Sequence, residues 1–249
     1  MKRVLILGGT SEATALAAKV STWPDVEVIT SLAGRTQHPS VPVGGTLRIG
    51  GFGGEKGLSQ YLLDNRIDVL IDATHPFAVQ ISFHAAAAAV DCKIPHLMLV
   101  RPAWKRLPPD QWIEVDSIEA GAAILPTCGR RVFLTVGRQQ LAPFAGLKDI
   151  WFLMRLIDPP AFDALVPPGK ILYARGPFSL DNERKLLLEH QIDTIVTKNS
   201  GGSATYAKIL AARELGLKVV MVKRPPAPPA ETVADVESAQ NWLLEKLQF

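Results

Sequence analysis

Two glycines that directly follow a short apolar run are the first residues of this chain that could bind a ligand. The run Arg3–Leu7 leads into Gly8, Gly9, Thr10, Ser11 and Glu12. This order predicts a strand, a tight turn and a helix N-terminus, where free N–H groups and the positive end of the helix dipole can hold a phosphate. A nucleotide ligand is the first hypothesis. A turn that only joins a strand to a helix is the alternative, because the spacing is not Gly-x-Gly-x-x-Gly.

A second group of residues lies where a nucleotide-binding fold would recognise the ribose. The next expected strand ends at Thr30 and Ser31, and no acidic residue follows before Arg35. At this place an acid favours NAD, whereas an arginine accommodates the 2′-phosphate of NADP. The sequence therefore favours NADP(H), with a solvated loop arginine as the alternative.

A glycine cluster, Gly50-Gly51-Phe52-Gly53-Gly54, follows the third expected strand. Glycines allow a backbone to approach a flat ligand closely, and they also occur in simple turns. Both interpretations of Gly51 and its neighbours stay open.

The segment Asp72-Ala73-Thr74-His75-Pro76-Phe77-Ala78 places polar and aromatic residues after a buried strand. Ligands of α/β folds bind at the carboxyl ends of the strands. His75 could donate a proton near neutral pH, or it could be a hydrogen-bonded structural residue. Pro76 would make the turn rigid and begin the next helix.

Cationic or small polar residues follow three expected strands of the second half. They are Gly137-Arg138, Arg175-Gly176-Pro177-Phe178 and Lys198-Asn199-Ser200-Gly201-Gly202. Their shared position predicts a substrate with several carboxylates, although surface salt bridges are the alternative for each. The last of these segments also resembles an anion-binding turn that precedes a helix.

No residues have a spacing typical of a Ser-His-Asp or Cys-His nucleophile or of a metal site. Hydride transfer requires chiefly a positioned cofactor and acceptor, because the cofactor carries the chemistry.

Short apolar runs alternate with helical patterns, which predicts an α/β fold with parallel sheets covered on both faces. The expected strands are Arg3–Leu7, Val26–Thr30, Leu47–Ile49, Val69–Asp72, His96–Val100, Arg131–Thr135, Trp151–Arg155, Ile171–Tyr173, Thr194–Thr197 and Lys218–Val222. The expected helices include Glu12–Ser21, Gly57–Asn65, Val79–Val90, Leu180–His190, Ser203–Leu215 and Val236–Leu247.

A weak internal repeat predicts two similar α/β domains. Residues 62–68 and 187–193 resemble each other, and each is followed by a strand, a polar turn, a helix, a strand and Arg-Pro. A boundary in the proline-rich segment after Arg101 gives domains of residues 1–102 and 103–249. We expect a ligand cleft between them, lined by the carboxyl ends of the strands.

Composition narrows the class of protein. The net charge is only +3, with no basic stripe of the kind that nucleic-acid binders have. Cys92 and Cys128 are the two cysteines and have no metal-ligand spacing. No apolar run is long enough for a membrane span or a signal peptide, so we expect a cytoplasmic protein without nucleic-acid or membrane partners. The sequence does not indicate an oligomeric state.

Several of these segments together resemble the precorrin-6A reductase family of cobalamin biosynthesis. The resemblance runs nearly from end to end and also includes Arg101-Pro102-Ala103-Trp104 and Val222-Lys223-Arg224-Pro225-Pro226. It implies two Rossmann-like domains and an NADPH-dependent reductase that transfers hydride to the precorrin-6A or cobalt-precorrin-6A macrocycle, giving precorrin-6B.

The resemblance also implies residue roles. Gly8, Gly9 and Thr10, with Ser31 and Arg35, would hold NADPH, while His75 and the segment from Lys198 would meet the nicotinamide and the tetrapyrrole. The full set of candidates is His75 and Lys198 for catalysis; Gly8, Gly9, Thr10, Ser11, Glu12, Ser31, Arg35, Gly51, Thr74, Pro76 and Phe77 for the cofactor; and Arg138, Arg175, Asn199, Ser200, Gly201, Gly202 and Tyr206 for the substrate. A reductase of another anionic small molecule and a non-catalytic dinucleotide sensor are the competing hypotheses.

Overall fold

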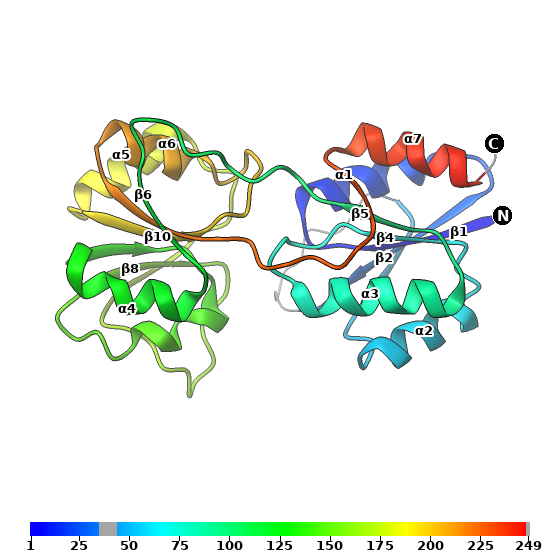
Figure 1. The fold of residues 1–249 in the computed structure, drawn as a ribbon, viewed down its shortest axis with the longest axis horizontal. Helices are drawn as coiled ribbons and strands as arrows, with labels where there is room; N and C mark the ends of the chain where they lie inside the picture. Colours follow the sequence, from blue (N-terminus) through cyan, green and yellow to red (C-terminus); the bar gives the residue numbers. More distant parts are fainter. Residues whose placement is uncertain (35–43, 248–249) are drawn as a thin grey trace. The chain divides into compact units, whose positions relative to one another are not determined.

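The computed structural model describes residues 1–34 and 44–247, and Figure 1 shows the chain. The chain forms two compact units. Residues 1–102 and 225–249 make the first unit, and residues 103–224 make the second. Each unit is built around one six-stranded parallel sheet, which confirms the expected α/β class.

The first unit has its sheet in the order β12-β5-β4-β1-β2-β3. The strands are β1 (Lys2–Leu7), β2 (Val26–Leu32), β3 (Thr46–Ile49), β4 (Val69–Asp72), β5 (His96–Leu99) and β12 (Glu231–Val233). The helices are α1 (Ser11–Val20), α2 (Glu55–Asp64), α3 (Val79–Cys92) and α7 (Val236–Leu247).

Both faces of this sheet are buried, which explains the unbroken apolar run in β1. Val4 and Ile6 pack in one core with α1 and α7, whereas Leu5 and Leu7 pack in a second core with α2 and α3. Successive side chains of a strand point to opposite faces, so every residue from Val4 to Leu7 is buried. This arrangement fixes the carboxyl ends of β1, β2 and β4 next to each other.

The second unit repeats this plan with the order β6-β11-β10-β7-β8-β9. Its strands are β6 (Gln111–Val115), β7 (Arg131–Leu134), β8 (Trp151–Leu156), β9 (Gly169–Tyr173), β10 (Thr194–Lys198) and β11 (Lys218–Val222). Its helices are α4 (Ile118–Cys128), α5 (Leu180–Glu189) and α6 (Ala207–Glu214), with short 3-10 turns η1 (Arg138–Gln140) and η2 (Ala142–Phe144). In the first sheet the central strand β1 comes first in the chain, whereas in the second sheet the edge strand β6 precedes the central strand β7.

One of the two edge strands of each sheet is contributed by chain that has just left the other unit. β6 and α4 follow β5 of the first unit but belong to the second, while β12 and α7 follow β11 of the second unit but belong to the first. β12 pairs in parallel with β5, and α7 buries Trp242 and Leu243 in the core that contains Leu16 of α1. The second unit therefore ends at Arg224, which differs from the expected domain of residues 103–249.

The ten expected strands are all present within two residues at either end, but β6, β12 and α4 were not among the expected elements. Both missed strands lie at sheet edges. β12 has only three residues, two of them polar, so it has no apolar pattern to detect. The helix expected from Ser203 begins instead at Ala207, because residues 204–206 form a turn.

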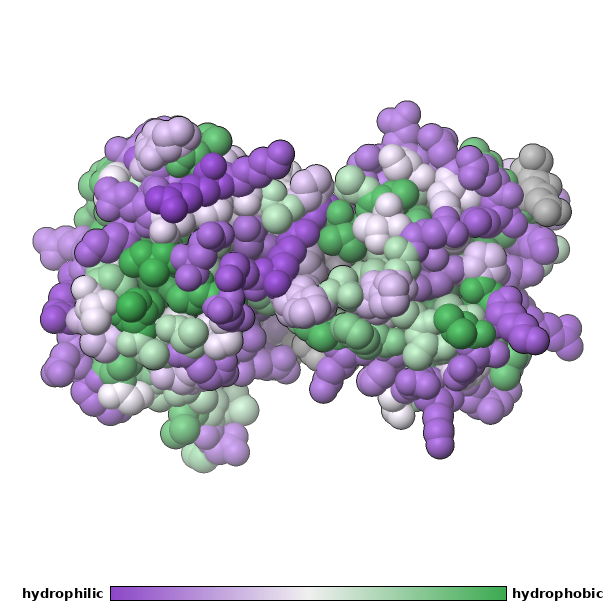
Figure 2. All heavy atoms as spheres, in the orientation of Figure 1, coloured by the Kyte–Doolittle hydropathy of each residue, from purple (hydrophilic) through white to green (hydrophobic). Residues whose placement is uncertain are grey.

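On the visible face of each unit, hydrophilic residues are intermixed with apolar ones (Figure 2). Across the described parts of the chain, none of the helices has both the length and the apolar character needed to cross a bilayer.

Candidate active site

The turn between β1 and α1 requires both of its glycines. A Cβ at Gly8 would lie 3.2 Å from side-chain carbons of Leu32 and Thr30, and Gly9 has a φ of +109°. Gly8 N–H donates to the carbonyl of Ser31 at 2.9 Å. The turn therefore lies directly against the end of β2, as a phosphate-binding turn of a Rossmann-like unit does.

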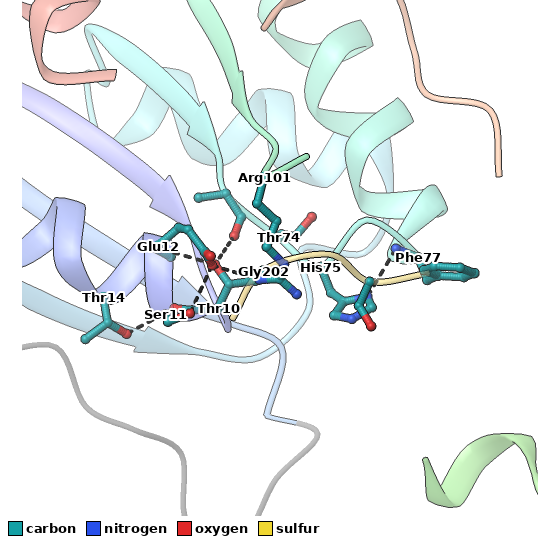
Figure 3. A network of polar contacts seen from close by, with 12 residues as sticks. Thr10, Ser11, Glu12, Thr14, Thr74, His75, Phe77, Arg101 and Gly202 are labelled. Atoms are coloured by element: carbon teal, nitrogen blue, oxygen red, sulfur yellow. Dashed lines mark hydrogen bonds and ion pairs between the residues drawn. The ribbon is translucent and has the colours of Figure 1, made fainter. Parts of the chain in front are cut away.

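Thr10 fixes the beginning of α1 in two directions (Figure 3). Its hydroxyl accepts a hydrogen bond from the N–H of Ala13 at 3.1 Å and donates one to the carbonyl of Ala73 at 2.7 Å. The first bond is a helix N-cap, and the second fastens the helix to the residue that follows β4. The N–H groups of Ser11 and Glu12, in the first turn of α1, have no acceptor within the helix. They can therefore bind an anion.

The Glu12 carboxylate forms an ion pair with Arg101, which follows β5 (Figure 3). Arg101 Nη1 lies 2.7 Å from Glu12 Oε2, and Ser11 Oγ donates to the same oxygen at 3.1 Å. Partial burial raises the pKa of Glu12, but the Arg101 charge and these hydrogen bonds outweigh it, so the pKa is lowered. The ion pair offsets a negative charge that would otherwise repel a phosphate at this helix end.

The ends of β2 and β3 form the next part of this edge. Ser31 is 5% exposed and pairs in register with Arg48 of β3, whose Nη1 donates to Ser31 Oγ at 3.2 Å. The hydroxyl of the adjacent Thr30 is buried and has no hydrogen-bond partner among the described residues. Arg35, the expected 2′-phosphate ligand, lies outside the described residues.

The end of β4 positions His75. Asp72 Oδ1 accepts hydrogen bonds from the N–H and hydroxyl of Thr74 at 3.0 and 2.7 Å. Asp72 Oδ2 is buried without a partner in the described part of the chain. His75 Nδ1 accepts the N–H of Phe77 at 3.2 Å, and the two rings lie 5.7 Å apart (Figure 3). An imidazole nitrogen that accepts a hydrogen bond carries no proton, so this contact places the proton of neutral His75 on Nε2.

In the second unit, the loop after β10 is fastened by two residues distant in sequence. The Asn199 amide bonds to the main chain of Trp104 on both sides: Oδ1 accepts from its N–H at 2.8 Å, and Nδ2 donates to its carbonyl at 3.1 Å. Trp104 Nε1 donates to the Gly202 carbonyl at 2.8 Å. Arg224 donates to the carbonyls of Asn199 and Ser200 at 2.9 and 3.0 Å. Asn199 thus has a structural task in shaping the loop.

The other cationic candidates of the second unit are spread over three loops. Lys198 Nζ donates to Gln140 Oε1 at 2.9 Å, which joins the end of β10 to η1. Arg138 Nη1 donates to the Pro159 carbonyl at 3.0 Å, and Arg175 is exposed. Gly201 and Gly202 have φ values of +67° and +74°. The Lys198–Gln140 hydrogen bond therefore joins the loops after β7 and β10, and Arg175 lies on the loop after β9.

A buried charged group lies beside these loops. Arg155 of β8 binds Glu183 of α5 through two hydrogen bonds of 2.5 and 2.7 Å, and its guanidinium lies 3.7 Å from the Phe178 ring centroid. Lys208 is 3% exposed and donates to the Thr205 carbonyl at 3.1 Å. Burial, followed by the charge of Arg155, lowers the pKa of Lys208 to about 7.

Comparison with known proteins identifies the family. Residues 3–244 match the model of the precorrin-6x reductase CbiJ/CobK family. The chain belongs to this family. It is 51% identical to the precorrin-6A reductase of Rhodococcus erythropolis, over 98% of each chain, and 30% identical to the cobalt-precorrin-6A reductase of Priestia megaterium, over 89% of this chain and 90% of the relative. A solved CobK precorrin-6A reductase has a TM-score of 0.92 and 39% identity, covering 99% of this chain and 97% of the other.

Membership of the precorrin-6x reductase family confirms the resemblance stated from the sequence. It makes the chain an oxidoreductase of cobalamin biosynthesis, with a tetrapyrrole as substrate and a nicotinamide cofactor. The first unit fits such a cofactor. The turn at Gly9 and Thr10 precedes a helix N-terminus, and buried polar atoms of Thr30 and Asp72 have no partner among the residues that the structure describes. No group of three or more metal-ligating side chains occurs in residues 1–34 and 44–247.

Sequence reasoning missed three residues of this reductase that shape the two parts of the site. Arg48 was hidden inside an apolar strand pattern, and its relation to Ser31 depends on strand register. Arg224 was identified only as part of the internal Arg-Pro repeat and of the family resemblance, and Trp104 only as part of the proline-rich boundary segment and of that resemblance. Their position at or just after Arg-Pro, where the chain passes between units, was the available signal. Tyr206, an expected substrate residue, has its ring centroid 5.8 Å from that of Trp104, and its hydroxyl accepts a hydrogen bond from Arg213.

Proposed function

We propose that this protein reduces the precorrin-6A macrocycle with NADPH, giving precorrin-6B. The turn from Gly8 to Thr10 is the observation that supports binding of the dinucleotide. Both of its glycines are required, and it places the N-terminus of α1 beside Ser31. The dinucleotide pyrophosphate binds at this helix end through the N–H groups of Ser11 and Glu12. Ser31 and Arg35 hold the phosphorylated ribose.

The end of β4 orients the nicotinamide. The turn from Thr74 to Phe77 is rigid. Asp72 accepts a hydrogen bond from the Thr74 hydroxyl, and His75 accepts one from the Phe77 N–H. When bound, NADPH supplies a hydride to an electron-poor ring carbon, and one proton completes the two-electron reduction. Neutral His75 can donate a hydrogen bond from Nε2 that polarises the reacting ring, and the Lys198 ammonium group holds a proton that can be transferred.

The second unit binds the carboxylates of the tetrapyrrole. Arg138, Arg175 and Lys198 supply positive charge, and Ser200, Gly201 and Gly202 supply the backbone of the loop after β10. Asn199 holds that loop in place through its two hydrogen bonds to Trp104. Because positioning of two large ligands supplies most of the rate, the fixed shape of this loop matters more than any single proton donor.

The metal-free macrocycle is the substrate that the comparisons favour. Identity to the Rhodococcus precorrin-6A reductase is 51%, against 30% for the Priestia cobalt-precorrin-6A reductase.

An anaerobic assay of NADPH oxidation with metal-free and cobalt-loaded precorrin-6A, side by side, tests this proposal. We expect stoichiometric NADPH oxidation and ring reduction with the metal-free compound and slower turnover with the other. Binding of NADPH without oxidation by either compound would contradict the reductase assignment and favour a dinucleotide sensor.

A further inference from the structure

Arg48 is the positively charged residue at the ribose end of the first unit whose position the structure describes. It stands on β3 directly beside Ser31, the last but one residue of β2. Parallel Rossmann-like sheets recognise the ribose at this point. Its guanidinium reaches back across the strand end, with Nη1 3.2 Å from Ser31 Oγ.

The guanidinium is held rigidly before any ligand arrives. Nη1 donates to the Gly50 carbonyl at 2.6 Å, and Nη2 donates to the Gly51 carbonyl at 2.8 Å. The group also lies 3.8 Å from the Phe52 ring centroid and 5.0 Å from that of Tyr61 on α2. Little side-chain entropy remains to be lost when such a group binds an anion.

These contacts do not neutralise the charge. Carbonyl oxygens and aromatic faces stabilise a guanidinium without cancelling its charge, and no carboxylate of the described residues lies within ion-pair distance of Arg48. Three other partly or fully buried arginines differ from Arg48, since Arg101 pairs with Glu12, Arg155 with Glu183 and Arg213 with Asp110. A half-buried, uncompensated cation at a ligand-binding edge is suited to an anionic partner.

The loop that Arg48 holds leaves room for that partner. Gly50, Gly53 and Gly54 have positive φ values, which require glycine, but Gly51 does not. A Cβ at Gly51 would meet no described atom within 4 Å. Neither backbone conformation nor packing against the described residues explains the missing side chain at Gly51, whereas close approach of a ligand does.

We propose that Arg48 is a specificity-determining residue that binds the 2′-phosphate of the dinucleotide, beside Ser31 and over Gly51. This inference rests on the proposed use of NADPH and adds a residue that the sequence analysis did not assign. One of the guanidinium's remaining N–H groups binds the phosphate while the others keep the glycine loop in place.

Binding of adenosine 2′,5′-bisphosphate and of adenosine 5′-monophosphate, measured by calorimetry on the full chain, tests the inference without turnover. We expect Arg48→Gln to weaken the bisphosphate about 10- to 100-fold, as loss of one charge-assisted hydrogen bond predicts. The monophosphate should change less than about threefold, because it lacks the group that Arg48 binds. Arg48→Lys should fall between wild type and Arg48→Gln for the bisphosphate, since it keeps the charge but loses the fork.

Lys56→Gln, on an exposed position of α2, is the matched control for loss of one positive charge and should change neither affinity. Equal weakening of both nucleotides by Arg48→Gln, with the melting temperature retained, would show that Arg48 only shapes the loop and would overturn the inference alone. A wild-type chain that binds NADH as tightly as NADPH would instead overturn the proposed cofactor, and this inference with it.

Discussion

The side-chain amide of Asn199 makes two hydrogen bonds to the main chain of Trp104, as a neighbouring strand would. Its amide accepts from the Trp104 N–H and donates to the Trp104 carbonyl, at 2.8 and 3.1 Å, while being 8% exposed. Trp104 follows the first passage of the chain between units, and Arg224, at the second, binds the carbonyl of the same Asn199. Both connecting segments therefore hold the loop that we propose binds the tetrapyrrole.

Asn199→Ala should destabilise this loop. The substitution leaves the N–H and carbonyl of buried Trp104 without partners, a cost of about 1–3 kcal/mol for each unsatisfied group. We expect a lower melting temperature and a higher KM for the tetrapyrrole, with NADPH affinity unchanged because the first unit is untouched. Asn182→Ala, at an exposed position of α5, is the control. A normal KM in Asn199→Ala would show that the loop does not contribute to substrate binding.

Thr10→Ala should weaken both α1 and the cofactor site. It removes the N-cap bond to Ala13 and the bond to Ala73, and loss of an N-cap alone costs about 0.5–2 kcal/mol. Thr10→Ser keeps the hydroxyl that makes both bonds. Denaturant unfolding and NADPH titration of the two variants should therefore show stability and affinity lost together in the first variant and largely retained in the second. Equal losses in both would point to the methyl group instead.

The parts of the fold that the sequence predicted are those with local signals. The strand, glycine turn and helix around Gly8 and Thr10 follow from adjacent residues, and so does the carboxyl-end position of His75. The partner of β12 does not, because three residues cannot specify a register, and its pairing with β5 is a contact across more than 130 residues of chain. Packing of α7 against α1 decides which unit residues 225–249 join.

Individual roles were harder to predict than positions. Asn199 lies in a segment that resembles an anion-binding turn, yet its amide bonds to Trp104, 95 residues earlier. Arg48 reads as a polar residue within an apolar strand, and only the register of β2 with β3 places it beside Ser31. Both depend on pairs of segments that no local pattern connects.

Lys208 should make stability depend on pH between neutrality and about pH 10. Its pKa is lowered to about 7, chiefly by burial and then by Arg155, partly opposed by Glu183, with Lys198 acting in the same direction as Arg155. An unfolded lysine stays protonated to about pH 10.4. Over this window the unfolded state holds more protons, so the free energy of unfolding should rise with pH.

Denaturant unfolding of wild type and Lys208→Met from pH 7 to 10 measures this contribution. We expect the difference between the two proteins to change by up to about 1.4 kcal/mol per pH unit, with wild type gaining relative to the variant as the pH rises. The other titrating groups cancel in the difference. Parallel stability curves would mean that Lys208 keeps an ordinary pKa in the folded protein.

His75→Phe should slow reduction of the macrocycle without weakening NADPH binding greatly. The variant removes the Nε2–H donor but keeps an aromatic ring beside Phe77, and loss of one donor that stabilises developing charge typically costs about 10²- to 10³-fold in rate. Single-turnover NADPH oxidation in H₂O and D₂O separates the steps: wild type should show a solvent isotope effect on the reduction step that the variant alters. Lys198→Met provides the parallel test of the second donor. Near-normal single-turnover rates in both variants would leave positioning as the main contribution to rate.

Leu243→Ala should show that α7, which follows the second unit in the chain but packs in the first, stabilises the cofactor-binding unit. Leu243 is fully buried in the core shared with Leu16, and removal of a buried leucine side chain costs about 2–5 kcal/mol. Its neighbour Leu244 is 42% exposed, so Leu244→Ala is a matched control of the same chemistry. Because α1 begins at the phosphate-binding turn and packs on α7, Leu243→Ala should also weaken NADPH binding, although it lies more than 220 residues later in the chain. Equal stability of the two variants would contradict the placement of α7 in the first unit.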